Sequence, residues 1–328
     1  MTQTCVVIDG NSLAHRAFHA YGRAEMTRTD GRPQEVCYGF LRLLIGVAEK
    51  IHARHGSIDH LVVGFDAPDS VRREWDAEYK ATRKPTDESL RAQMGELRAL
   101  LDAAGITQLE CAGWEADDIA AAAAAIVRGT PETRLVVVTS DRDAIALVSD
   151  TVEVLQIRNG MDSARFLDPE AVLQAYGVHP SRYQLLAALR GDPSDNLAGI
   201  SGLGPKKAGL VADRHATVEA ISNDLALAEL IGAKTAATLI LGLDVVRHNL
   251  TMMAGVTDLD IPILAAPLPD AGQLTSALEA AELLGLARQC SRYLTAHANV
   301  ASVSTHPNRV SPGPTRLAVE DDGALSLF

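Results

Sequence analysis

Short apolar runs alternate along the first half of the chain with longer segments of helical periodicity, and three of the runs end in an acid. Asp9, Asp66 and Asp141 end the runs that start at positions 5, 61 and 135, and Asp143 follows two residues after the last. Apolar runs of this length, bounded by turn residues, predict buried strands. Strands that alternate with helices predict a mostly parallel, doubly wound α/β sheet.

Four further segments extend this alternation. Apolar residues at helical spacing predict a helix at about 35–55, and a second helix is expected at about 86–104. Short strands are expected at 106–111 and 152–157. Strand signals stop near Tyr176, so helices are expected to dominate from there to about residue 295.

Three carboxylates lie together at Glu115, Asp117 and Asp118, directly before a run of alanines. One interpretation is the first turn of a buried helix, where the helix dipole favours acids. The other is a metal site, because crowded carboxylates repel one another and a divalent cation relieves the repulsion. A single strand-ending Asp is usually a turn residue or a helix cap. Three such strands beside this cluster are harder to explain as caps, because ligands of open α/β sheets bind beyond the carboxyl ends of the strands.

Positive charge concentrates just after the second acidic strand end. Six Lys or Arg residues fall within 72–91, and Trp75 and Tyr79 lie among them. Cations for phosphates and rings for base stacking are what single-stranded nucleic acid requires. An exposed amphipathic helix with solvated charges explains the same pattern. Arg16 is expected on the first helix, near the acidic rim, where it either holds a phosphate or pairs with an acid.

The composition is that of a globular protein of 328 residues, with 47% hydrophobic and 22% charged residues. The net charge of -12 argues against a simple basic nucleic-acid binder, although bound metal ions would offset part of it. No run approaches the roughly 18 apolar residues of a membrane helix, and because the first strand begins almost at once no signal peptide is expected. The four cysteines form no CxxC pair, so reduced thiols and a cytoplasmic location are expected.

A Gly-rich segment, Gly199–Gly204, lies in the helical part of the chain, between Gly191–Asn196 and the pair Lys206 and Lys207. Close-set glycines before a helix let backbone N–H groups approach a phosphate, and the lysines add positive charge. The spacing is not that of a Walker motif, so the pattern alone is weak. From about residue 301 the chain is rich in Ser, Pro, Asn and Thr and is expected to be disordered.

Taken together, these motifs resemble the bacterial 5′-nuclease family, which includes flap endonucleases and the 5′-exonuclease domain of DNA polymerase I. The resemblance covers roughly residues 4–290, in the family's order of motifs. The motifs are Val-Ile-Asp9-Gly, Gly-Phe-Asp66, Tyr79-Lys80-Ala-Thr-Arg83, Gly-Trp-Glu115-Ala-Asp117-Asp118, Thr-Ser-Asp141-Arg-Asp143, and Gly191-Asp192-Pro-Ser-Asp195-Asn196 followed by Gly-Ile-Ser-Gly-Leu-Gly-Pro-Lys. Every acidic position of the family is occupied and the chain ends before any polymerase domain, so an active, stand-alone enzyme is expected.

The resemblance implies a PIN-like nuclease domain at 1–175, with a helical arch over the active site at about 68–95. It also implies a smaller helical DNA-binding domain at 176–295, whose helix-three-turn-helix element at about 184–214 grips duplex DNA. A disordered tail at 301–328 would follow.

The hairpin of that element would bind duplex DNA through Gly199, Gly202 and Gly204, with Lys206 and Lys207 at the start of the next helix. In the family this hairpin often holds a potassium ion through backbone carbonyls, so K⁺ is an expected second cofactor.

The resemblance further assigns the acids to two or more Mg²⁺ or Mn²⁺ ions, the metals that oxygen-only ligand sets favour. One metal group would be Asp9, Asp66, Glu115 and Asp117, and the other Asp141, Asp143, Asp192 and Asp195, with Asp118 supporting or shared.

The remaining site residues follow from the same resemblance. Lys80 and Arg83 would contact the scissile phosphate, with Lys80 as an electrophilic catalyst. Arg16 would bind DNA and Tyr79 would stack the terminal base. The expected activity is 5′-3′ exonuclease and flap endonuclease cleavage by a monomer, on DNA with a 5′ single strand next to duplex, in replication and repair.

Three other functional classes stay open. A metal-dependent phosphatase or phosphotransferase also needs acids at strand ends, but it needs neither the Gly-rich hairpin nor the basic, aromatic stretch. A non-catalytic DNA-binding protein would keep the hairpin and lose acids. A PIN-like ribonuclease would lack the helix-three-turn-helix element.

The last five residues, 324–328, suggest a docking peptide. Leu325, Leu327 and Phe328 match the bacterial sliding-clamp motif Gln-Leu-(Ser/Asp)-Leu-Phe at four of five positions together with Ser326, and Ala324 replaces the usual Gln. These residues either fold back on the core, are a random remnant, or bind the clamp, where tethering would raise the effective concentration of the nuclease.

Overall fold

The structure is a computed structural model that describes residues 2–22, 24, 26–158 and 160–295. These residues belong to one compact unit, Met1–Ala298. The expected tail and the clamp-like residues 324–328 lie outside the described residues.

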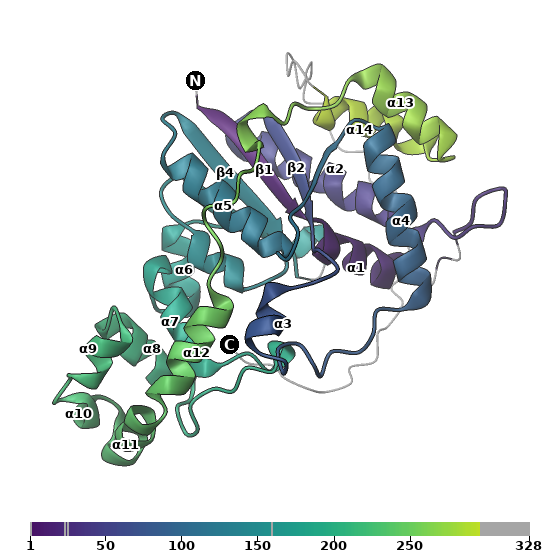
Figure 1. Ribbon diagram of the computed structural model, residues 1–328. Helices are drawn as coiled ribbons and strands as arrows, with labels where there is room; N and C mark the ends of the chain where they lie inside the picture. Colours follow the sequence, from purple (N-terminus) through teal and green to yellow (C-terminus); the bar gives the residue numbers. More distant parts are fainter. Residues whose placement is uncertain (1, 23, 25, 159, 296–328) are drawn as a thin grey trace, which may run out of the picture. The chain divides into compact units, whose positions relative to one another are not determined.

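The elements alternate between strands and helices up to residue 167 and are helical after it (Figure 1). The strands are β1 Gln3–Asp9, β2 His60–Phe65, β3 Thr107–Glu110, β4 Thr133–Thr139, β5 Val152–Gln156 and β6 Arg165–Leu167. The helices of the first half are α1 Gly10–Tyr21, α2 Glu35–His55, α3 Val71–Trp75, α4 Glu88–Ala103 and α5 Ala116–Arg128, with 3-10 turns η1 Asp143–Leu147 and η2 Met161–Ser163. Those of the second half are α6 Pro169–Tyr176, α7 Pro180–Arg190, η3 Pro193–Asp195, α8 Pro205–Arg214, α9 Val218–Ser222, α10 Leu227–Ile231, α11 Ala233–Leu241, α12 Leu243–Met253, η4 Ile263–Ala265, α13 Ala271–Ala280, η5 Leu284–Leu286 and α14 Ala287–Leu294.

The six strands form one sheet in the order β3-β2-β1-β4-β5-β6. All neighbouring strands run parallel except β5 and β6, which pair antiparallel. The predicted parallel α/β sheet is therefore confirmed, as are the five predicted strands. The sixth strand, β6, was not predicted, because three residues are too few to show a periodicity.

Alternate residues of each central strand face opposite sides of the sheet, as the pleat requires. On one side Val7 and Val137 pack with the alanine-rich α5 and with helices α6 to α12. On the other side Val6 and Val136 pack with α1, α2, α4 and the last two helices. The sheet is therefore doubly wound, with a hydrophobic core on each face (Figure 1).

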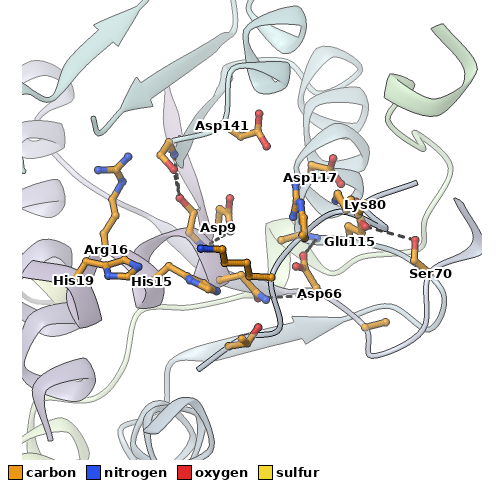
Figure 2. A pocket seen from close by; sticks show the side chains of 18 of the residues that line it. Asp9, His15, Arg16, His19, Asp66, Ser70, Lys80, Glu115, Asp117 and Asp141 are labelled. Carbon is orange, nitrogen blue, oxygen red and sulfur yellow. Dashed lines mark hydrogen bonds and ion pairs between the residues drawn. The ribbon is translucent and has the colours of Figure 1, made fainter. Parts of the chain in front are cut away.

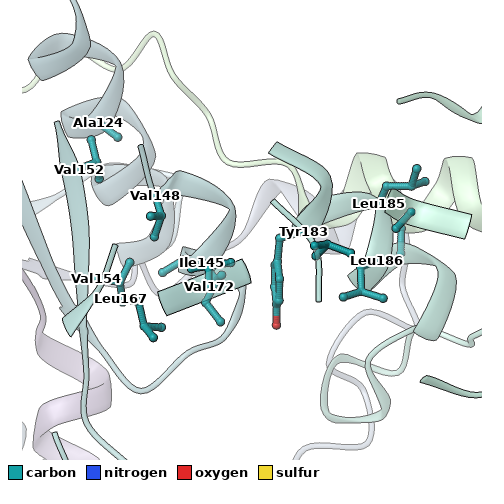
Figure 3. Packing of buried hydrophobic residues seen from close by; sticks show 14 of the residues in the cluster. Ala124, Ile145, Val148, Val152, Val154, Leu167, Val172, Tyr183, Leu185 and Leu186 are labelled. Carbon is teal, nitrogen blue, oxygen red and sulfur yellow. The ribbon is translucent and has the colours of Figure 1, made fainter. Parts of the chain in front are cut away.

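The first of these cores continues without a break from the sheet into the helical half. Figure 3 shows Val152 and Val154 of β5 beside Ile145 and Val172, with Tyr183 and Leu186 of α7 next along the same layer. Buried residues of α8, α11 and α12 extend this cluster. The helices after Tyr176 thus share a core with the sheet. None of the helices in the described ranges is long and apolar enough to cross a membrane.

The stretch expected to form a helical arch is only partly helical. Helix α3 covers five residues, turns follow around Lys80, and α4 begins at Glu88. The charged side chains around Lys80 therefore come from turns rather than from one amphipathic helix.

Candidate active site

An open cavity of about 1050 Å³ lies at the carboxyl ends of the central strands. Strand β1 is flanked by β2 on one side and β4 on the other, so the chain reverses its winding at β1. Ligands of doubly wound sheets bind at such a switch point. Five of the predicted acids line this cavity: Asp9, Asp66, Glu115, Asp117 and Asp141. The expectation that strand ends and the Glu115 helix share one rim is therefore confirmed.

Asp9 ends β1 and caps α1, so both interpretations of a strand-ending Asp apply to it. Its Oδ1 accepts a 2.8 Å hydrogen bond from the N–H of Ser12, and its Oδ2 accepts one of 2.8 Å from the hydroxyl of Thr139. Burial, followed by the charges of Asp66 and Asp141, raises the pKa of Asp9 to about 7 against the opposing effect of these hydrogen bonds. An ionised Asp9 in this position favours a nearby cation.

Asp66 connects the end of β2 to the start of α5. Its Oδ1 accepts a 2.9 Å hydrogen bond from the N–H of Ala116, and its own N–H donates to Asn11. Burial raises the pKa of Asp66, and the charge of Glu115 adds to the rise. The carboxylate of Asp66 therefore holds the first turn of α5 against the sheet.

Asp117 has an unsatisfied oxygen. Its Oδ1 is buried and has no hydrogen-bond partner among the described residues. Burial, followed by the charge of Asp118, raises the pKa of Asp117 well above its ordinary value. A buried polar oxygen without a partner is costly, so this atom is available to a ligand that the chain itself does not supply.

The turn that carries Lys80 lies directly against these acids. Lys80 Nζ donates a 2.7 Å hydrogen bond to Glu115 Oε2 and lies 3.9 Å from Asp195 Oδ2. Arg83 pairs with the carboxylate of Asp195 and donates to the carbonyl of Ser194. The cations predicted to meet a phosphate are thus paired with predicted metal ligands.

This turn is fixed by backbone contacts in an uncommon conformation. Lys80 and Asn196 both have positive φ, of 56° and 62°, in the region that non-glycine residues rarely occupy. The backbone N–H of Lys80 donates to the carbonyl of Asp195, and the side-chain Nδ2 of Asn196 donates to the carbonyl of Glu78. Two strained turns that hold each other in place are typical of a functional site.

Tyr79 is placed differently from the sequence prediction. Its ring is 3% exposed and packs with Leu197 and Met252, and its hydroxyl donates to Glu115 Oε2 at 3.1 Å. A ring buried in this way is not accessible to a nucleic-acid base. Tyr79 instead orients the Glu115 carboxylate, and Trp75, which is half exposed and edge-on to Trp114, is the accessible aromatic ring nearby.

Asp118 does not line the cavity. Its carboxylate is fully buried and forms two 2.7 Å hydrogen bonds with the guanidinium of Arg72. The structure therefore pairs Asp118 with Arg72 and keeps its carboxylate out of the cavity that Glu115 and Asp117 line. Arg72 was not predicted as a site residue. It is one of six Lys or Arg residues within 72–91, and the sequence does not distinguish the buried one from the others.

The second predicted acid group lies beside the first, around the end of β4. Burial, followed by the charges of Asp141, Asp192 and Asp195, raises the pKa of Asp143 to about 7. Asp192 is held by its own turn, since its Oδ1 accepts hydrogen bonds from the N–H and the hydroxyl of Ser194. These four acids are close enough to influence one another, but only Asp141 lines the cavity.

The opposite wall of the cavity is basic. Figure 2 shows Arg16, His15 and His19 on one side of Asp9, with Lys80, Glu115 and Asp117 on the other. Arg16 donates a hydrogen bond to the backbone carbonyl of Arg158 rather than to one of the predicted acids. The two histidines were not predicted as site residues. Their i, i+4 spacing on the helix after Asp9 is the signal that could have revealed them.

The Gly-rich hairpin is packed too closely for any side chain at its entry. A Cβ at Gly199 would lie 1.9 Å from the carbonyl oxygen of Arg190, and Gly202 has a φ of +76°. Gly204 caps α8, which begins at Pro205 and carries Lys206 and Lys207 in its first turn. Lys206 is exposed, whereas Lys207 donates a 2.9 Å hydrogen bond to Thr235.

The predicted ligands suit a hard divalent cation. All are carboxylates, and oxygen-only ligands favour Mg²⁺ or Mn²⁺ over zinc. Within the described residues no three His, Cys, Asp or Glu side chains already form a metal-binding group. Lys80 and Arg83 pair with two of the acids instead, and the Oδ1 of Asp117 is a buried oxygen without a hydrogen-bond partner that a metal could use.

Comparison with known proteins agrees with this geometry. Residues 4–177 match the family model described as the 5′-3′ exonuclease, N-terminal resolvase-like domain. The chain is 34% identical over 220 residues to a 5′-3′ exonuclease of Aquifex aeolicus, covering 67% of this chain and 72% of that one. It is also 37% identical over 270 residues to DNA polymerase I of Mycobacterium bovis. The matched residues are 80% of this chain but only 28% of the polymerase.

A solved structure shares the fold. The bacteriophage T5 D15 flap endonuclease, in a pseudo-enzyme-product complex with DNA and metal ions, superposes with a TM-score of 0.60 at 18% identity, over 87% of this chain and all of that one. The mostly parallel sheet with its helices is thus the PIN-like fold that the sequence predicted. The family match and the cavity at the strand ends lead to one identification: the chain belongs to the 5′-3′ exonuclease family.

Proposed function

We propose that this chain is a metal-dependent 5′-nuclease that hydrolyses DNA phosphodiesters, with 5′-3′ exonuclease and flap endonuclease activity in replication and repair. The observation that carries the proposal is the cavity, where five carboxylates from three strand ends and α5 meet Lys80, Arg83 and Arg16. The T5 relative of the same fold, crystallised with DNA and metal ions, supports it.

The acids would hold two or more Mg²⁺ or Mn²⁺ ions. In this proposal Asp9, Asp66, Glu115 and Asp117 form one group of ligands, and Asp141, Asp143, Asp192 and Asp195 the other. Such ions activate water and stabilise the attacking and leaving oxygens of a phosphodiester.

The chain's own cations would bind the substrate. Lys80 Nζ lies 2.7 Å from Glu115, so a short side-chain movement brings it to a phosphate beside the acids. There it would favour the negative charge that develops during cleavage. Arg83 would hold the same phosphate, and Arg16, on the opposite wall, would bind the backbone of the single strand.

The helical half would hold the duplex. We place the nuclease domain at 1–175, the DNA-binding domain at 176–295 and the helix-three-turn-helix element at 184–214. The hairpin of Gly199, Gly202 and Gly204 would bring backbone groups to the duplex and hold K⁺ through its carbonyls, and Lys206 would contact phosphate. Only glycine fits at position 199, which supports a hairpin kept thin for close approach.

Three further points belong to the proposal. The enzyme acts as a monomer, and its last five residues, with Leu325, Leu327 and Phe328, bind the sliding clamp. Titration of a peptide of residues 324–328 into the clamp, with the Leu327→Ala, Phe328→Ala peptide as control, tests the latter. Finally, the four cysteines form no disulfide, which fits a reduced, cytoplasmic environment.

The decisive experiment compares four substrates: a labelled 5′-flap duplex, a nicked duplex with a recessed 5′ end, single-stranded RNA and a small phosphate monoester. We expect cleavage of the first two in Mg²⁺ or Mn²⁺ and none in EDTA. Preference for the RNA would support a ribonuclease, preference for the monoester a phosphatase, and tight binding without cleavage a non-catalytic DNA-binding protein.

A variant pair ties this activity to the cavity. Asp117→Asn should lower turnover by orders of magnitude while largely preserving DNA binding, because the lost charge serves the metal. Asp150→Asn is the matched control, because Asp150 is exposed and precedes β5, at the amino end of that strand, whereas the cavity lies at the carboxyl ends of the strands. Near-normal cleavage by Asp117→Asn would remove the active-site assignment.

A further inference from the structure

A buried ion pair lies behind the first turn of α5, outside the cavity. Arg72 of α3 is 1% exposed and Asp118 of α5 is 0% exposed. The guanidinium and the carboxylate meet in two parallel hydrogen bonds of 2.7 Å each. A bidentate pair of this kind fixes the relative orientation of the two groups as well as their separation.

The guanidinium also holds the end of the helical half. Arg72 Nε donates to the carbonyl of Met252 and Nη2 to the carbonyl of Ala254, both at 2.9 Å. Met252 lies in the last turn of α12, where the chain returns toward the sheet. Four of the five N–H groups of Arg72 are therefore occupied by partners from two distant segments.

The carboxylate is equally occupied. Besides the two bonds from Arg72, Asp118 Oδ2 accepts a 3.0 Å hydrogen bond from the N–H of Glu115, and Oδ1 accepts one of 3.1 Å from the N–H of Val256. A carboxylate has about four lone-pair positions, and these four donors use them. No oxygen of Asp118 is left for a metal ion.

We propose that Asp118 is a positioning residue rather than a metal ligand, and that with Arg72 it couples the helical half to the acids of α5. The coupling rests on the proposed nuclease function. Because Asp118 holds the N–H of Glu115, the pair determines where the first turn of α5 presents its acids to the cavity. Because Arg72 holds the carbonyls at 252–254, the same pair determines where α7–α12 join the sheet.

Metal binding separates a positioning residue from a ligand. Mn²⁺ is titrated calorimetrically into the wild-type chain, Asp118→Asn and Asp117→Asn, without DNA. We expect Asp118→Asn to keep the wild-type number of bound ions with an affinity about 10-fold lower, as for residues that orient ligands. Asp117→Asn should bind one ion fewer. Loss of an ion from Asp118→Asn would overturn the proposal, whereas no Mn²⁺ binding by any form would contradict the proposed function instead.

The coupling has its own readout in single-turnover cleavage. For the wild-type chain, a 5′-flap on duplex should be cleaved faster than the isolated single strand, and the ratio measures how far duplex binding assists the chemistry. Arg72→Gln should lower that ratio about 10-fold or more at saturating DNA and Mn²⁺. The control is Arg98→Gln, which breaks a surface pair with Glu110. An unchanged ratio in folded Arg72→Gln would refute the coupling.

A measurement on the unmodified chain avoids the risk that variants of a buried pair fail to fold. Hydrogen exchange is followed at the amides of Glu115 and Val256, which donate to Asp118. We expect Mg²⁺ to leave their protection unchanged or to increase it, since Asp118 keeps both bonds when metal binds elsewhere. Faster exchange of these two amides on addition of Mg²⁺ would mean that Asp118 moves to the metal, and the proposal would be wrong.

Discussion

Replacing Asp9 by Asn distinguishes a helix cap from a metal ligand. If Asp9 only caps α1, Mg²⁺ should stabilise the variant and the wild-type chain equally. If Asp9 binds metal, Mg²⁺ should stabilise the wild-type chain more. In the metal-free chain, burial raises the pKa of Asp9 from 3.8 to about 7. The folded state therefore binds a proton more tightly than the unfolded state. The stability that this proton provides is complete below pH 3.8 and is lost as the pH rises through about 7.

The size of the effect follows from that pKa. At pH 8 Asp9 is ionised, and the rise in its pKa corresponds to roughly 4 kcal/mol of destabilisation of the folded state. Asn has no charge, so the variant is free of this destabilisation. Asn keeps an oxygen for the N–H of Ser12 but loses the acceptor for the Thr139 hydroxyl, at a cost of about 1 kcal/mol. Without metal, Asp9→Asn should therefore be more stable than the wild-type chain by roughly 2–3 kcal/mol, or about 5 °C in Tm.

Thermal melts at pH 8 test this, in EDTA and in excess Mg²⁺. Metal at about 100 times its Kd stabilises the wild-type chain by about 2.7 kcal/mol, so the order of the two proteins should reverse or converge. At pH 4 in EDTA the advantage of the variant should largely disappear. Asp270→Asn, at the N-cap of α13, is the capping control, and Mg²⁺ should shift the Tm of this variant as much as that of the wild-type chain. If Mg²⁺ stabilises wild type and Asp9→Asn equally, Asp9 is a helix cap and no metal ligand.

Three further predictions concern other parts of the chain. Lys80→Ala should lower the single-turnover rate about 100-fold with little loss of DNA affinity, and a change in affinity alone would exclude the electrophile role. Lys206→Ala should weaken duplex binding and reduce its salt slope by about one, whereas Lys207→Ala should affect the slope less, because Lys207 already bonds Thr235. Burial lowers the pKa of His55, so stability should fall as the pH drops below 6.5, and melts of His55→Gln between pH 5 and 8 should show a smaller fall.

The strands and their acidic ends could be predicted because their signals are local. An apolar run followed by Asp shows both a buried strand and the residue at its carboxyl end, and a parallel sheet then brings Asp9, Asp66 and Asp141 to one rim. The acids of α5 could be added for the same reason, since they stand at the start of an alanine-rich helix.

Contacts between distant segments could not be predicted in this way. Nothing in the sequence around Arg72 distinguishes it from Arg73, yet Arg72 is buried on Asp118 and Arg73 lines the cavity. Tyr79 was expected to be exposed because it lies among charges, but its place is decided by Leu197, far along the chain. Which of several similar residues points inward depends on tertiary packing that periodicity does not record.

The acidic net charge is compatible with the proposed DNA substrate, because DNA binding depends on the charges near the cavity and not on the total charge of the chain. In the free chain the cations that would bind phosphate are held by carboxylates: Lys80 by Glu115, and Arg83 by Asp195. A divalent ion bound by these acids would weaken both pairs, since it supplies the positive charge that the side chains provide in its absence. The cations then become free for a phosphate at the site where the acids have been neutralised. On this argument the net charge of -12 describes the metal-free chain, and DNA meets a much less acidic surface at the cavity once metal is bound.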